Sequence, residues 1–98
     1  MTYRLHPAAL DDLQESVGFY SERGGPVLAR TFLDRFEDTA NKIISNPAIG
    51  TPRYHNKRRF IMAYFPYSII YEITNDEIRI YAVAHQSRKP GFWKDRRF

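Results

Sequence analysis

The chain has 98 residues, enough for one domain with a single hydrophobic core and little margin beyond it. Its apolar (43%) and charged (27%) fractions are those of an ordinary globular chain, and no apolar run approaches the roughly 20 residues that a membrane span requires. The absence of cysteine excludes disulfide bonds and thiol chemistry, and it slightly favours a cytoplasmic location.

The net charge of +4 is carried by the C-terminal end of the chain. Residues 1–86 contain ten basic and ten acidic side chains, whereas residues 87–98 contain five basic and one acidic. Within the neutral part, residues 8–46 hold seven acids and four bases, and residues 53–59 hold four bases and no acid. A basic loop and tail predict an anionic partner, either nucleic acid or an acidic protein segment, with a merely solubilising surface as the equally weighted alternative.

The N-terminal half predicts a strand and a pair of helices. Pro7 stands at a position where helices commonly begin, because its missing N–H would be unpaired there in any case. Apolar side chains then recur at helical spacing in two runs, which a Gly-Gly-Pro sequence at 24–26 separates and an Asn-Pro sequence at 46–47 ends. We therefore expect a strand over residues 2–6 and a hairpin of two helices over residues 8–22 and 27–45.

Residues 58–88 are the stretch around which the rest of the chain is organised. Three runs rich in Ile, Tyr, Phe and Val are separated by short breaks at 66–67 and 75–76, which is typical of an antiparallel meander. The last run alternates, so we expect one face to pack on the helices and the other to carry polar groups. The first face would hold Ile78, Ile80, Ala82 and Ala84, and the second Glu77, Arg79, Tyr81, Val83 and His85.

The predicted element order is β-α-α-β-β-β within one domain spanning residues 1–98. This order predicts an α+β fold, in which a helical hairpin packs on one face of a four-stranded antiparallel sheet. Residues 46–57 predict a loop, and the partner of the first strand stays open. In the basic tail, residues 87–98, Pro90-Gly91 argues against a continuous helix, and we expect Phe92 and Trp93 to fold back onto the body.

Few kinds of chemistry fit these residues. The three histidines are far apart in the sequence and there is no glycine-rich phosphate loop, so we expect no metal site and no cofactor. What remains is a set of Arg, Lys, Tyr and His side chains, which could bind a phosphate backbone and stabilise the charge formed when a 2′-hydroxyl attacks its own phosphodiester. His85 could act as a general acid or base, because an imidazole titrates near neutrality. The alternative is that these side chains simply cover and stabilise the sheet.

Four segments together resemble a known superfamily. They are YRLHPAALDDL (3–13), NPAIGTPR (46–53), RRFIMAYFPYSIIYEI (58–73) and IRIYAVAHQSRKPGFW (78–93). In their order and spacing they resemble the RelE/ParE superfamily of bacterial type II toxin–antitoxin toxins, over nearly the whole chain. The resemblance implies a toxin that halts growth until a cognate antitoxin neutralises it, and a fold that agrees with the one predicted above.

The resemblance also implies a partner. Antitoxins of this superfamily typically wrap the toxin with an extended, often helical and acidic C-terminal segment, so we expect a hetero-oligomer. The basic loop and tail would receive such a segment or a nucleic acid. The residues expected to make these contacts are Arg53, Lys57, Arg58, Arg88 and Lys89.

The superfamily divides by target, and the sequence favours one branch. RelE-like members cleave messenger RNA on the ribosome, and in this chain that activity would rest on Arg59, Arg79, Tyr81 and His85. ParE-like members inhibit DNA gyrase and need no catalytic residues. The long second helix and the NPAIGTP segment are more ParE-like, and Gln86 stands where ribonuclease members often carry a tyrosine. A homologue that has lost toxicity and acts only as a binding module is a third reading.

Overall fold

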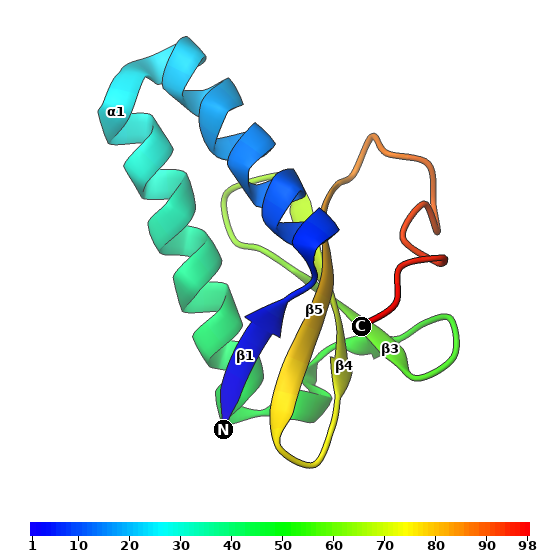
Figure 1. Ribbon diagram of the computed structural model, residues 1–98. Coiled ribbons are helices and arrows are strands. Elements are labelled where there is room, and N and C mark those ends of the chain that lie inside the picture. Colours follow the sequence, from blue (N-terminus) through cyan, green and yellow to red (C-terminus); the bar gives the residue numbers. More distant parts are fainter.

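The computed structural model describes all of residues 1–98. Figure 1 shows one long, doubled-back helix packed on one face of a sheet, with the C-terminal tail on the other side. We call the sheet face under the helix the inner face and the opposite one the outer face. The elements are β1 (Thr2–Leu5), α1 (Pro7–Ser45), the 3-10 turn η1 (Pro47–Ile49), β2 (Thr51–Pro52), β3 (Lys57–Ile61), β4 (Tyr67–Ile73) and β5 (Glu77–His85).

The two predicted helices form the single element α1, which turns back on itself at Gly25. Gly25 has φ 76° and ψ −171°, a backbone conformation that glycine reaches without steric cost, and Pro26 opens the second arm. At the start of α1, the imidazole Nδ1 of His6 accepts a hydrogen bond from the Ala8 N–H at 2.9 Å and so caps the helix beside Pro7. The predicted reversal at residues 24–26 is therefore present, with helical geometry on both sides of it.

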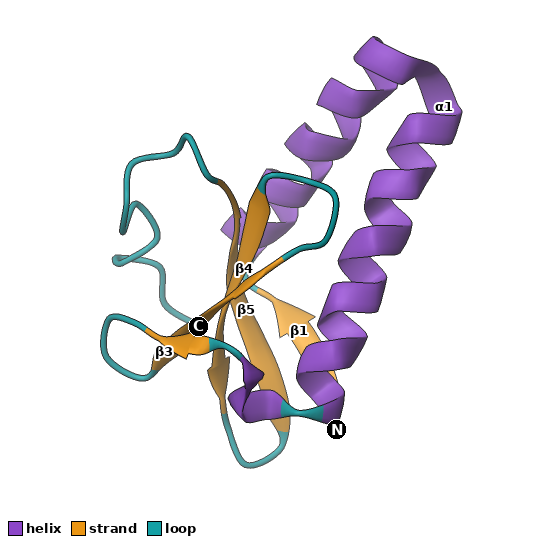
Figure 2. Ribbon diagram, turned by 180° about the vertical axis from the view of Figure 1, so that it is seen from behind, coloured by secondary structure: helices purple, strands orange, loops and turns teal.

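The sheet has five strands in the order β1-β5-β4-β3-β2, and it is mixed (Figure 2). The predicted four-stranded, wholly antiparallel sheet is wrong in two details, because β1 runs parallel to β5 and the short strand β2 pairs with β3. The parallel pair follows from the number of chain reversals. The two arms of α1 return the chain to the end of the sheet where β1 began, and β3, β4 and β5 then alternate, so β5 runs in the direction of β1.

A β-bulge in β5 changes which side chains face the helix. Tyr71 pairs with Ile80 and Ile70 pairs with Ala82, so Tyr81 is an extra residue in β5. The predicted alternation holds up to Tyr81 and is wrong from Ala82 onward, because the extra residue shifts the later side chains to the other face. His85 shifts with them, and its ring meets that of Tyr67, a residue of the main core, at 4.9 Å. Val83 thus joins Ile78 and Ile80 in the main core, whereas Ala82 and Ala84 lie with Tyr81 and Ile70 on the outer face.

The main core lies between α1 and the inner face. Phe32 and Phe36 of α1 are at most 1% exposed and pack against Ile69 and Ile80 of the sheet, which are completely buried. Each such side chain contributes about 1.5–3 kcal/mol by leaving water. None of the helical segments combines the length and apolar character that crossing a bilayer demands.

The segment predicted as a loop, residues 46–57, is partly structured by one buried tyrosine. Tyr71 donates a hydrogen bond from its hydroxyl to the Pro47 carbonyl at 2.6 Å and accepts one from the Gly50 N–H at 2.8 Å. A Cβ at Gly50 would lie only 2.6 Å from that hydroxyl oxygen, so glycine is needed for the close approach. These contacts hold η1 and β2 at the edge of the sheet.

The tail folds back onto the outer face, as predicted. Trp93 is 6% exposed and forms a small cluster with Ile70, Tyr81 and Ala82. Arg96 binds the Asp12 carboxylate of α1 with an N–O distance of 2.6 Å, and both side chains are largely buried. The tail is therefore attached both to the sheet and to the helix.

Candidate functional site

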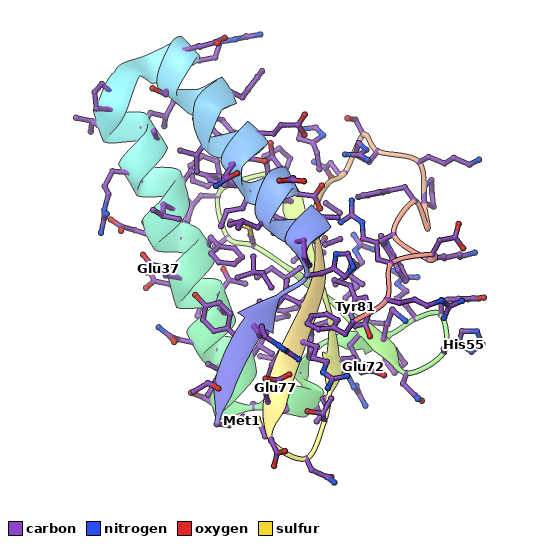
Figure 3. All side chains as sticks on the ribbon, in the orientation of Figure 1. Met1, Glu37, His55, Glu72, Glu77 and Tyr81 are labelled. Atoms are coloured by element: carbon purple, nitrogen blue, oxygen red, sulfur yellow. The ribbon has the colours of Figure 1, made fainter.

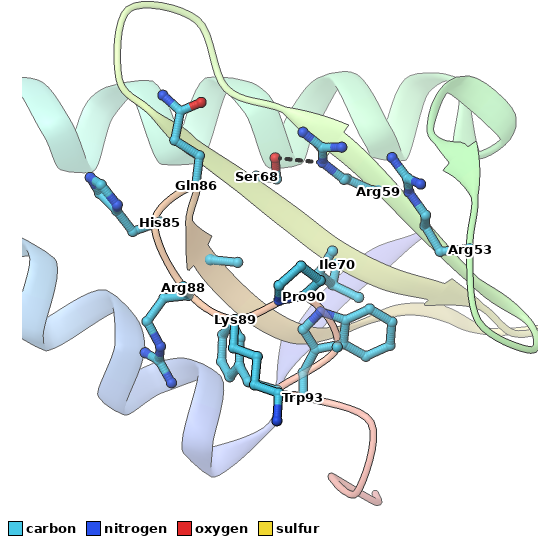
Figure 4. Close-up of a pocket in the computed structure, with 13 residues that line it drawn as sticks. Arg53, Arg59, Ser68, Ile70, His85, Gln86, Arg88, Lys89, Pro90 and Trp93 are labelled. Carbon is cyan, nitrogen blue, oxygen red and sulfur yellow. Dashed lines mark hydrogen bonds between the residues drawn. The ribbon is translucent and has the colours of Figure 1, made fainter.

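A cavity of about 320 Å³ opens on the outer face between the sheet and the tail (Figure 4). Its sheet side is made by residues of β3, β4 and β5, and its other side by residues 86–93. Its lining includes basic residues and no acidic residue. The ionisable or polar side chains that line it are Arg53, Arg59, Ser68, His85, Gln86, Arg88 and Lys89.

Arg59 and His85, two of the four residues expected for RNA cleavage, both line this cavity. Arg59 donates from Nε to the Ser68 hydroxyl at 3.0 Å and has no carboxylate partner. His85 accepts the Ser87 N–H at Nδ1 (3.0 Å), and the Ser87 hydroxyl lies 2.7 Å from the same nitrogen. Because Nδ1 accepts, a neutral His85 carries its proton on Nε2, where it can donate to a bound group.

Tyr81 and Arg79, the other two, lie outside the cavity beneath the last residue of the tail. The Tyr81 hydroxyl donates to a Glu72 carboxylate oxygen at 2.9 Å (Figure 3). The rings of Tyr81 and Phe98 meet edge to face at 4.9 Å. Burial, followed by the bond to Glu72 and the charge of Glu72, raises the pKa of Tyr81 above its ordinary value. A tyrosine bound in this way does not exchange protons readily near neutral pH.

Arg79 is engaged in a surface ion-pair group at the start of β5. It donates from Nε to Glu77 at 3.1 Å, and Arg4 of β1 binds the same carboxylate oxygen at 2.8 Å. The hydrogen bond from Arg79, with added help from Arg4, holds the pKa of Glu77 below its ordinary value. The structure thus brings two of the four predicted residues together at the cavity. The other two lie outside it, each bound to a carboxylate of the same chain.

The residues expected to bind a partner divide in the same way. Arg53, Arg88 and Lys89 line the cavity. Arg58 instead donates to the Gly50 carbonyl at 2.8 Å, which supports the loop, and the Lys57 ammonium lies over the Tyr81 ring at 4.3 Å. The structure gathers no three His, Asp or Glu side chains in a geometry that could hold a metal ion.

The sequence reasoning missed the Asp12–Arg96 pair. Asp12 is one of the seven acids counted in residues 8–46, yet it is only 6% exposed, and it also accepts the Val83 N–H at 3.1 Å. A signal was available, because Asp12 lies three residues from Ala9 and four from Ser16, both buried, and thus falls within the buried stripe of the helix. Nothing in the local sequence distinguishes Arg96 from Arg97.

Comparison with known proteins identifies the family. A family model described as "ParE toxin of type II toxin-antitoxin system, parDE" matches residues 3–90. The chain belongs to the ParE toxin family. This confirms the predicted superfamily and the favoured ParE-like branch of type II toxin–antitoxin toxins.

Individual relatives agree with the ParE assignment. The chain is 28% identical over 89 residues to Toxin ParE2 of two Mycobacterium tuberculosis strains, CDC 1551 / Oshkosh and ATCC 25618 / H37Rv, which covers 90% of this chain and 84% of each relative. A solved structure titled "Chromosomal ParDE TA system from P. aeruginosa" matches with a TM-score of 0.77 and 19% identity, over 87% of this chain and 95% of that one. At that identity the match shows the fold, and it confirms the α+β class.

The ParE match ends within the tail. Its last residue is Pro90, so Trp93, Arg96 and Phe98 lie beyond the part that the family model covers. Trp93 lines the cavity, Arg96 forms the ion pair with Asp12, and the Phe98 ring packs against Tyr81. The outer face of this ParE-family chain is therefore completed by a segment outside the family match.

Proposed function

We propose that this ParE-family toxin inhibits growth by binding DNA gyrase and that a cognate antitoxin neutralises it. The observation that carries the proposal is the family match over residues 3–90, since gyrase inhibition is the activity that the ParE branch implies. Such a target places the toxin in the cytoplasm.

The arrangement of the outer face supports a binding function over an enzymatic one. Acid–base catalysis requires donor and acceptor groups that meet at one reacting atom. Of the four residues considered for RNA cleavage, Tyr81 and Arg79 are bound to carboxylates away from the cavity that Arg59 and His85 line. A protein that acts by binding needs no such convergence.

The helical hairpin supports a protein target. Figure 1 shows the turn of α1 projecting beyond the sheet, and near this turn Val27 is 79% exposed and Phe19 46% exposed. Exposed apolar side chains on a projecting element favour contact with another protein. We propose that this end of the hairpin contacts gyrase.

The antitoxin would bind the basic outer surface. Arg53, Arg88 and Lys89 have no carboxylate partner within the chain, and an acidic segment that becomes helical on binding would supply one. The expected product is a toxin–antitoxin hetero-oligomer.

The test is supercoiling by purified gyrase in the presence of the purified toxin. We expect inhibition by the wild type and by His85→Ala and Arg59→Ala, and at least tenfold weaker inhibition by the double variant Phe19→Glu/Val27→Glu, because burying two carboxylates in a contact costs several kcal/mol. Gln14→Glu/Asn41→Glu is the matched control, because it adds two carboxylates at exposed positions of α1, one on each arm, away from the turn. If the Phe19→Glu/Val27→Glu variant inhibits gyrase as well as the wild type, the hairpin is not the surface that contacts gyrase.

The RelE-like alternative retains one supporting observation, which is that Arg59 and His85 line the same cavity. Induction without antitoxin separates the readings. A DNA-damage response, filamentous cells and intact transcripts agree with gyrase. Transcripts cut within coding regions would instead indicate ribosome-dependent cleavage, provided that Arg59→Ala or His85→Ala abolishes the cutting. If induction causes no growth defect, the chain acts only as a binding module.

A further inference from the structure

The cavity on the outer face is hollow because the strands carry small side chains there. Ser68 of β4 pairs with Ala84 of β5, and neither fills the space above the sheet. Ile70 forms an apolar floor next to them, and the tail passes over this depression with Pro90 and Trp93. The bulge at Tyr81 is what turns Ala84 toward the outer face.

The cations around the cavity lack counter-charges. Arg53, Arg59, Arg88 and Lys89 line it, and none of the four forms an ion pair with a carboxylate. Arg59 is held by Ser68, and the Arg88 guanidinium lies on the Phe92 ring at 3.8 Å. These contacts fix two of the cations without neutralising them.

Arg96 differs from these four cations, because it has a structural role and is neutralised by a carboxylate of the same chain. Arg96, in the same tail, is matched by Asp12 at 2.6 Å. Like charges gathered around one concave surface repel one another and favour an anion between them. The unpaired set therefore indicates a ligand with more than one negative charge.

The size and lining of the cavity narrow the ligand further. At about 320 Å³ it is as large as small-molecule pockets in other proteins, and it exceeds what a single inorganic anion fills. Its basic rim surrounds a floor and wall of Ile70, Ala84, Pro90 and Trp93 (Figure 4). The fitting ligand has a doubly charged group joined to a flat, less polar body.

We propose that this cavity binds a nucleotide, with the phosphate at Arg53 and Arg59 and the body of the nucleotide over Ile70 and Pro90. A phosphate monoester carries close to two negative charges at neutral pH, and its oxygens accept forked hydrogen bonds from guanidinium groups. Binding here involves no cleavage and does not depend on gyrase, so it can fail without affecting gyrase inhibition. It shares Arg53, Arg88 and Lys89 with the surface proposed for the antitoxin, so a nucleotide and an acidic antitoxin segment would compete for this site.

Trp93 provides the readout, because it is the only tryptophan of the chain and it lines the cavity. The purified full-length toxin is titrated at low salt with adenosine monophosphate, inorganic phosphate, a short single-stranded RNA and polyglutamate, and Trp93 fluorescence is recorded. We expect saturable binding of the nucleotide, tighter than that of inorganic phosphate. The ratio of RNA to mononucleotide affinity then shows whether the natural source is a free nucleotide or the end of a strand.

Two variants test the contacts. Arg59→Gln removes the guanidinium that Ser68 holds. Arg53→Gln removes an exposed guanidinium that lines the cavity and forms no side-chain hydrogen bond, so this variant should fold even if Arg59→Gln does not. Each should weaken nucleotide binding about tenfold or more, the loss typical of one charged hydrogen bond. Arg30→Gln is the matched control, since Arg30 is exposed on α1 and pairs only with Asp34.

The titrations either support or overturn the nucleotide site. Saturable nucleotide binding that Arg53→Gln weakens and Arg30→Gln leaves unchanged supports the site. No saturable nucleotide signal at millimolar concentration, equal weakening by Arg30→Gln, or tighter binding of polyglutamate than of the nucleotide overturns it. The last result would assign the cavity to an acidic peptide.

Discussion

The two faces of the sheet are built in different ways. The inner face packs against α1 through a continuous cluster of 13 buried residues, which is the main hydrophobic core of the fold. The outer face has only four buried residues in its cluster, together with one buried ion pair and a cavity rimmed by unpaired cations. The apolar packing that stabilises the fold is therefore concentrated beneath α1, which leaves the outer face free to carry charge and to receive a partner.

The largest expected effect is on the inner face. Phe36→Ala should lower the free energy of unfolding by about 3–5 kcal/mol, because it leaves a cavity in the best-packed part of the molecule. Denaturant unfolding followed by far-UV circular dichroism measures the loss. Phe19→Ala is the control, since Phe19 is 46% exposed, and an equal loss in both variants would contradict the assignment of the core.

The ion pair should be the strongest single contribution to the outer face. Asp12→Asn leaves Arg96 without its counter-charge and should cost about 3 kcal/mol, the low end for a buried pair, because Arg96 keeps 16% of its side chain exposed. Asp11→Asn, next to it and exposed, should change stability little. Trp93 fluorescence should shift toward that of exposed tryptophan in Asp12→Asn alone, and an unchanged spectrum would mean that the tail is held by other contacts.

A smaller effect is expected where the edge of the sheet meets η1. Tyr71→Phe removes one hydroxyl and leaves the Pro47 carbonyl and the Gly50 N–H unpaired, at a cost of about 1–3 kcal/mol. Tyr54→Phe, at an exposed tyrosine, is the control. Hydrogen exchange of the Gly50 amide should accelerate in Tyr71→Phe, and exchange as slow as in the wild type would show that another group replaces the hydroxyl.

The smallest expected effect is a dependence on acid at the solvent-exposed start of β5. The folded-state pKa of Glu77 is depressed by Arg79 and Arg4, so its stabilisation is present above the ordinary carboxyl pKa of 4.5 and is lost as the pH falls further. Glu77→Gln should therefore flatten the fall in Tm below about pH 4.5. Asp76→Asn, in the adjacent turn, should leave the slope as it is.

How far the sequence determines these features differs between the faces. The apolar spacing of α1 and the break at Gly25 follow from local rules, and the parallel pairing of β1 with β5 follows from counting reversals, a step that the prediction did not take. The bulge at Tyr81 could not be predicted, because residues 81–84, Tyr-Ala-Val-Ala, are apolar or aromatic on both faces and so hide the change of phase. It depends on how β4 and β5 pair in three dimensions.

The candidate site was the least predictable part. Its basic residues were identified by composition, but their division into a cavity and a satisfied group depends on where the tail lies. That position is set by Trp93 and Arg96, which meet partners far away in the sequence, in Ile70 and Asp12. Periodicity reports which residues of one element share a face, and it carries no information about contacts across more than 80 residues.

The contact between Asp12 and Arg96 has a consequence for the lifetime of the folded state. It joins positions 84 residues apart in the chain. Because closing so long a loop costs conformational entropy, we expect the pair to form only after the strands have assembled beneath α1. A contact that forms after the folding barrier mainly slows unfolding, so this ion pair should lengthen the lifetime of the native state more than it speeds folding.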